Sequence, residues 1–177
     1  GKVFRGYHGG AAEFGHTIVE RGGIRCECGN KGCLEKYVGW PAIYSRIVSS
    51  IAGNSYTSMT DMVNGELSDL SPSVFLKALE GKDRLALNIM EDTASYLSTG
   101  IINIVNLFNP DLILLGGEVA RENHILMERV NELVAEKALK TNVSGLKICS
   151  SSLGKDFELI SAANLVLHDQ FQFSLSG

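Results

Sequence analysis

Four side chains of the kind that bind metals lie close together near the start of this sequence. His16, Cys26, Cys28 and Cys33 have the spacing His-x9-Cys-x-Cys-x4-Cys. One imidazole and three thiolates complete a tetrahedral zinc site and leave no position for water, which is typical of a structural zinc and not a catalytic one. The alternative is a cysteine cluster without metal, in which one thiol belongs to a disulfide and His16 is an ordinary core histidine.

Two carboxylates, Glu13 and Glu35, lie at the edges of this cluster. A rigid metal loop over residues 13–35 would hold them in place as acceptors for the hydroxyl groups of a polar ligand, most naturally a sugar. Most glutamates are simply solvated surface residues, which is the alternative for this pair.

A second candidate site follows an apolar run at residues 111–115. Gly116 and Gly117 lie between this run and a helical pattern. Open α/β sheets bind ligands at the carboxyl ends of their strands, where such a junction lies. The same pair is also common as a plain tight turn.

The patterning of the chain predicts one α/β domain, residues 1–177, with an irregular metal-bearing lobe at its N-terminal end. The apolar run 111–115 suits a strand of a parallel sheet covered on both faces. Residues 53–71 are polar and predict a loop or a small excursion from the main body. We expect strands at 2–5, 17–20, 111–115 and 146–150, and helices at 11–14, 34–38, from 41 to about 51, 72–80, 83–108, 119–139 and 156–171.

Composition limits the function classes. The 177 residues include 45% hydrophobic and 20% charged residues, as in an ordinary globular protein, and the net charge of −4 argues against a nucleic-acid surface. No apolar run has the length of a membrane span, and the first residues do not form a signal peptide. Clustered cysteines without a secretory signal predict metal in a reducing, cytoplasmic setting. Cys149, in the apolar stretch LKIC, is expected to be a buried small hydrophobe.

Several stretches together resemble the ROK family of bacterial sugar kinases and sugar-responsive repressors. They are GAAEFGH (10–16), CECGNKGCLE (26–35), FNPDLILLGG (108–117) and SAANLVL (161–167). The resemblance implies the C-terminal domain of an actin-like, ribonuclease-H-like ATPase fold with a zinc-binding loop. Ala12 stands where the family kinases frequently have glycine, a departure that leaves Glu13 and His16 in place.

The resemblance also implies roles for residues. His16, Cys26, Cys28 and Cys33 would bind zinc, while Glu13, His16 and Glu35 would contact a sugar. In a kinase, Gly116 and Gly117 would lie on the nucleotide side. The family further implies a homodimer and a sugar or sugar-phosphate ligand.

Three functions remain open at this point. The first is the effector-sensing, dimerising domain of a repressor, which binds DNA only through a separate N-terminal domain. The second is the C-terminal half of a sugar kinase that uses ATP and Mg²⁺. The sequence starts without methionine, and the family's phosphate loops and catalytic aspartate have no counterpart in it, so we expect an N-terminal lobe to be absent and this chain alone not to transfer phosphate. The third is a zinc-stabilised structural domain without a ligand.

Overall fold

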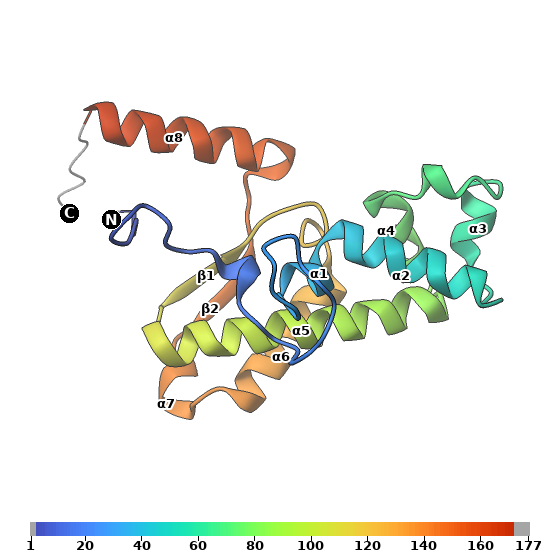
Figure 1. Cartoon of the computed structure of the whole chain (residues 1–177), viewed down its shortest axis with the longest axis horizontal. Coiled ribbons are helices and arrows are strands. Elements are labelled where there is room, and N and C mark those ends of the chain that lie inside the picture. Colours follow the sequence, from blue (N-terminus) through green and yellow to red (C-terminus); the bar gives the residue numbers. More distant parts are fainter. Residues whose placement is uncertain (1–2, 172–177) are drawn as a thin grey trace.

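The computed structural model describes residues 3–171, which form a helical body with a small parallel sheet at one side (Figure 1). The regular elements are α1 (Glu35–Val38), α2 (Trp40–Ala52), α3 (Ser58–Met62), α4 (Pro72–Glu80), α5 (Arg84–Phe108), β1 (Leu112–Leu115), α6 (His124–Lys137), α7 (Lys140–Val143), β2 (Lys147–Ser150) and α8 (Phe157–Phe171), with 3-10 turns η1 (Phe14–His16), η2 (Leu67–Asp69) and η3 (Gly154–Asp156). None of the helices in this part of the chain combines the length and hydropathy needed to cross a bilayer.

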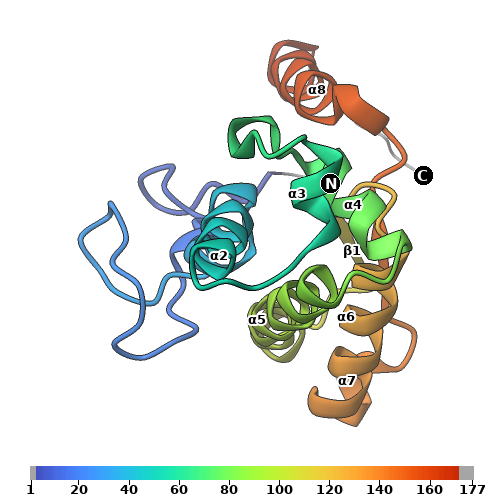
Figure 2. The same ribbon diagram turned by 90° about the vertical axis from the view of Figure 1, so that its right-hand side faces the viewer.

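Helix α5 forms the centre of the body, and its predicted range is confirmed. The Asp83 side chain caps its N-terminus by accepting a hydrogen bond from the Ala86 N–H at 2.9 Å. The helix ends where Asn109 takes a left-handed conformation (φ 45°) before Pro110. Figure 2 shows α2 and α6 on different sides of α5, and both contact it. The apolar stripe of α5 is therefore buried on more than one side.

The sheet consists of β1 and β2, which pair in parallel with Leu112 opposite Lys147 and Leu114 opposite Cys149. Both strands were predicted, but the expectation that β1 is covered on both faces is wrong. Ile113 is partly buried against the helical core, whereas Leu112 and Leu114 are 46% and 54% exposed. Cys149 is exposed as well, contrary to the prediction. The reason is that α5 and α6 cover one face, while α8 stands away from the other (Figure 1).

The N-terminal segment is less regular than predicted. Residues 3–5 form no strand, and Lys2 lies outside the described residues. The predicted strand 17–20 is reduced to one bridge between Ile18 and Cys33, and the predicted helix 11–14 is replaced by η1. The polar segment 53–71, predicted as a loop, contains α3 and η2. Helix α3 forms because Thr57 caps it and Met59 is fully buried.

Candidate metal centre and adjoining carboxylates

Two short antiparallel pairings shape the segment between Glu13 and Glu35. One joins Ile18 to Cys33, and the other joins Arg25 to Lys31. Between the second pair, the Cys26 N–H donates to the Asn30 carbonyl at 2.9 Å, so that the chain reverses tightly. This reversal brings together three cysteines that are close, but not adjacent, in the sequence.

The predicted metal ligands come together at this reversal. The ligand atoms of His16, Cys26, Cys28 and Cys33 all lie within 4.8 Å of one another. Cys28 Sγ is 3.6 Å from Cys33 Sγ, and Cys26 Sγ is 3.6 Å from His16 Nδ1. A tetrahedral centre with thiolate bonds of about 2.3 Å and imidazole bonds of about 2.0 Å separates its donor atoms by about 3.5 to 3.8 Å. The donor set and its spacing therefore fit one metal ion.

The three thiols of this cluster have different proton affinities. A hydrogen bond to the Glu35 carboxylate, with Cys26 Sγ 2.9 Å from Glu35 Oε1, raises the pKa of Cys26 to about 12. A backbone hydrogen bond from Asn30 lowers the pKa of Cys28, and burial raises the pKa of Cys33. Metal binding must remove the protons of the ligating thiols, so affinity for a metal falls as pH falls.

His16 lies between the cysteines and the carboxylates. Its Nδ1 is 3.6 Å from both Cys26 Sγ and Glu35 Oε1, and its Nε2 is 4.0 Å from Glu13 Oε2. The Glu13 side chain is 71% exposed and that of Glu35 40%, so both carboxylates can be reached by a ligand. The structure thus brings together all three residues that the sequence suggested for sugar contacts.

Helix α5 supports this site through a glycine that sequence reasoning did not single out. A Cβ placed at Gly100 would lie 2.7 Å from Phe14 Cζ and 2.9 Å from Leu34 Cδ2. Phe14 follows Glu13, and Leu34 precedes Glu35, so the two apolar neighbours of the carboxylates both rest on the bare backbone of the helix. The signal in the sequence was a glycine inside a strongly helical pattern, which often marks close packing.

Tyr37 is a second supporting residue that the sequence did not reveal. Its hydroxyl oxygen accepts a hydrogen bond from the Ile24 N–H at 2.8 Å, which ties the loop to α1. A Cβ at Gly23 would lie 2.0 Å from the same oxygen, so the turn before Ile24 requires glycine.

Gly116 and Gly117 follow β1, and Gly117 has a positive φ of 94°. They line a shallow pocket with Arg121 and Ser151 at the carboxyl ends of the two strands. The expected helix from 119 begins only at His124, because Asn123 caps α6 by accepting from the Leu126 N–H at 3.0 Å. No residue lining this pocket belongs to the metal loop, so the two candidate sites are separate surfaces.

Comparison with known proteins relates nearly the whole chain to one protein family. A model of the ROK family matches residues 1–169. The N-acetylglucosamine repressor of Escherichia coli is 32% identical over 153 residues, which are 86% of this chain and 36% of the repressor. The glucokinase of Thermotoga maritima is 27% identical over 166 residues, 94% of this chain and 52% of the enzyme. The chain therefore spans between about a third and a half of these relatives.

A solved structure shares the fold. The crystal structure of a ROK family glucokinase from Streptomyces griseus, in complex with glucose and AMPPNP, matches with a TM-score of 0.77. The match covers 93% of this chain and 54% of that chain at 24% identity. The mixed α/β arrangement of the present chain is thus that of a solved ROK protein.

Proposed function

The chain belongs to the ROK family, and from that premise we propose that it is the sugar-sensing, dimerising C-terminal domain of a transcriptional repressor. In this proposal, residues 1–177 form one domain of the actin-like, ribonuclease-H-like class in a cytoplasmic protein. DNA is bound by another part of the protein. The similarity to the N-acetylglucosamine repressor, 32% identical over 86% of this chain, supports this choice.

The metal of the loop is proposed to be zinc, held by His16, Cys26, Cys28 and Cys33. Three thiolates and an imidazole are ligands that zinc prefers, and four protein ligands leave no open position. When bound, zinc would cross-link the loop and keep the thiols deprotonated. The role of the metal is then to fix the loop that carries Glu35, as an indirect support for the ligand.

The observation that carries the sugar proposal is the position of His16 between the cysteine cluster and the carboxylates. With Nδ1 facing Cys26, the ring presents Nε2 toward Glu13. If His16 bound the metal through Nδ1, its neutral imidazole would carry the proton on Nε2 and could donate it in a hydrogen bond to a sugar oxygen. Glu13 and Glu35 accept hydrogen bonds from sugar hydroxyls. The effector is a sugar or a sugar phosphate.

A second candidate function is the C-terminal half of an ATP-dependent sugar kinase. It is favoured by the similarity to the Thermotoga maritima glucokinase and by the glycine turn after β1. Gly116 and Gly117 would then face the nucleotide, which brings Mg²⁺ with it. Titration with a nonhydrolysable ATP analogue separates the two functions: heat that disappears in Gly117→Val favours the kinase.

The experiment that tests the main proposal combines metal analysis with sugar titration. We expect one equivalent of zinc per chain, and binding of N-acetylglucosamine or glucose that Glu13→Gln abolishes. Cys28→Ser should lose metal and sugar affinity together, because Glu35 depends on the loop. Glu118→Gln, an exposed change beyond β1, is the matched control. Clearly less than one equivalent of zinc refutes the metal assignment, and full sugar affinity in metal-free Cys28→Ser refutes the coupling. If no sugar produces heat on titration, the remaining function is that of a zinc-stabilised structural domain without a ligand.

A further inference from the structure

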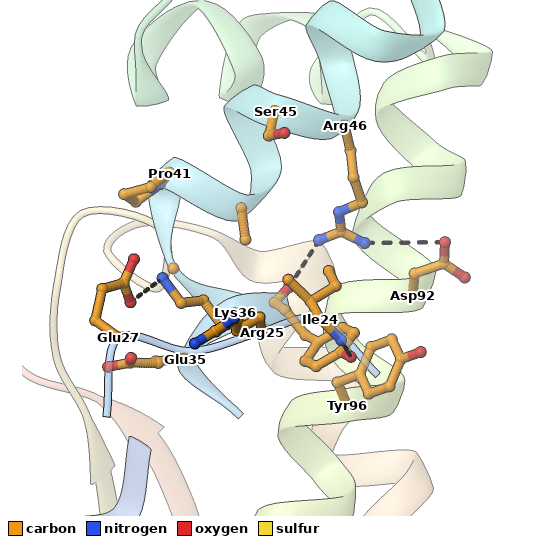
Figure 3. Close-up of a pocket in the computed structure, with 13 residues that line it drawn as sticks. Ile24, Arg25, Glu27, Glu35, Lys36, Pro41, Ser45, Arg46, Asp92 and Tyr96 are labelled. Carbon is orange, nitrogen blue, oxygen red and sulfur yellow. Dashed lines mark hydrogen bonds and ion pairs between the residues drawn. The ribbon is translucent and has the colours of Figure 1, made fainter. Parts of the chain in front are cut away.

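A cleft of about 690 Å³ opens beside the metal loop (Figure 3). Its walls come from the loop, α1, α2 and α5, and Glu35 lies at one end of it, away from Arg46 and Tyr96. This volume lies within the range of about 300 to 1,000 Å³ that small-molecule sites have. Glu13 and His16 do not line the cleft, so Glu35 is the residue that it shares with the proposed sugar site.

The charges that line the cleft are balanced. Three cations and three carboxylates face it: Arg25, Lys36, Arg46, Glu27, Glu35 and Asp92. Lys36 forms an ion pair with Glu27, and Arg46 Nη1 lies 3.9 Å from Asp92 Oδ2. A charged ligand would bring an uncompensated charge into this set. A neutral ligand with many hydroxyl groups would instead find both donors and acceptors.

Arg46 is fixed in place before any ligand binds. Its Nη2 donates to the Tyr37 carbonyl at 2.7 Å and to Thr93 Oγ1 at 2.8 Å. Its Nη1 is too far from Asp92 for a direct hydrogen bond, so a hydroxyl group can accept from Nη1 and donate to Asp92. Because the guanidinium is held by other partners, little side-chain entropy is lost when a ligand binds.

An aromatic wall completes the cleft. The Tyr96 and Tyr37 rings pack with their centroids 4.2 Å apart and an interplanar angle of 30°. Pro41 and Ala42 add apolar surface from the start of α2. A rigid ring with a polar tip suits a ligand that has both apolar C–H faces and hydroxyl groups.

We propose that this cleft binds a second sugar ring, so that the site prefers a disaccharide or a longer saccharide to a monosaccharide. This inference rests on the proposed sugar site: the first ring lies at Glu13 and His16, and the second passes Glu35 into the cleft. Asp92, Arg46 and the Tyr96 ring contact the second ring. They determine ligand length and take no part in binding the first ring.

The test is calorimetric titration of the zinc-loaded chain with matched pairs of ligands. These are N-acetylglucosamine against di-N-acetylchitobiose, glucose against cellobiose, and xylose against xylobiose. In at least one of the three pairs, we expect the disaccharide to bind roughly tenfold more tightly than the monosaccharide. One or two added hydrogen bonds would give a gain of this size. Asp92→Asn and Tyr96→Leu should remove most of this advantage without changing monosaccharide affinity. Asp69→Asn, an exposed change outside the cleft, should leave both affinities unchanged.

The outcomes separate the two proposals. Monosaccharide binding with no gain for any disaccharide overturns the inference and leaves the first sugar site intact. A disaccharide gain that survives both Asp92→Asn and Tyr96→Leu also overturns it, because the second ring would then lie elsewhere. If no monosaccharide and no disaccharide binds, the sugar site itself is refuted and the inference falls with it. Circular dichroism of each variant shows whether a lost affinity reflects unfolding.

Discussion

Replacing Gly32 with alanine should damage the metal loop far more than the same replacement at Gly29. Both glycines lie in the loop and have positive φ, 82° and 95°. They differ in their surroundings: a Cβ at Gly32 would lie 1.8 Å from the Glu20 carbonyl oxygen, whereas a Cβ at Gly29 would meet no atom within 4 Å. Gly29→Ala therefore measures the backbone strain alone, and Gly32→Ala measures strain plus a backbone collision.

The size of the difference follows from the contacts that the collision would break. An L-residue in the left-handed region costs about 1 to 2 kcal/mol, which both variants share. To accommodate a Cβ at Gly32, the two segments must separate, which disturbs the hydrogen bonds from Gly32 N to the Ile24 carbonyl (2.8 Å) and from Val19 N to the Gly32 carbonyl (2.9 Å). At about 0.5 to 1.5 kcal/mol each, with the added strain of moving backbone, Gly32→Ala should be about 2 to 4 kcal/mol less stable than Gly29→Ala.

Urea unfolding of both variants, followed through the fluorescence of the single tryptophan, measures this difference. Trp40 is a suitable reporter because it is the first residue of α2 and packs against the core, with its ring centroid 6.3 Å from that of Phe75. Metal release to a chelator should be fast in Gly32→Ala and near the wild-type rate in Gly29→Ala. Equal losses of stability in the two variants would show that the approach of Glu20 to Gly32 does not shape the loop.

Three further changes test other parts of the structure. Asp83 caps α5 and also accepts hydrogen bonds from Thr57 and Ser58; burial opposes its charge, but these bonds lower its pKa below the ordinary 3.8. The stabilisation by the Asp83 carboxylate is therefore complete above pH 3.8 and is lost as pH falls through the lower folded-state pKa. Asp83→Asn should lose at least about 1 kcal/mol of unfolding free energy at neutral pH, and its stability in urea titrations should depend less on acid pH. Identical pH profiles of the variant and the wild type would contradict this. Phe75→Ala, which empties a position only 1% exposed, should cost about 3 to 5 kcal/mol in thermal unfolding, and a loss below 1 kcal/mol would mean that α4 is not part of the core. Thr93→Val leaves an Arg46 N–H without its acceptor and should cost about 1 to 3 kcal/mol. Thr93→Ser keeps the hydroxyl and loses one buried methyl group, so it should cost less, about 0.8 kcal/mol. Equal costs would assign the effect to packing.

Local sequence patterns predicted the long helices, but not the segments whose structure depends on packing against distant parts of the chain. The range of α5 was correct because its apolar period, its cap at Asp83 and the stop at Asn109 are all local signals. The strand expected at 17–20 has the right residue types, but the described residues form only one β-bridge there, at Ile18, and the Val19 and Glu20 N–H groups both donate to the Gly32 carbonyl. The loop that follows residue 20 is held by hydrogen bonds of Gly32 and Tyr37, which no local pattern in the sequence reveals.

The cluster around His16 could be predicted because ligand chemistry requires specific residue types at close spacing. The sequence by itself determined which imidazole, thiols and carboxylates gather in the loop, and that β1 is a strand. Only the tertiary structure decided that Leu114 and Cys149 are exposed, that Arg46 points into a cleft and that Glu35 lies between that cleft and His16. Residue type and spacing determine what a side chain can bind, but exposure and direction depend on which distant segments pack around it.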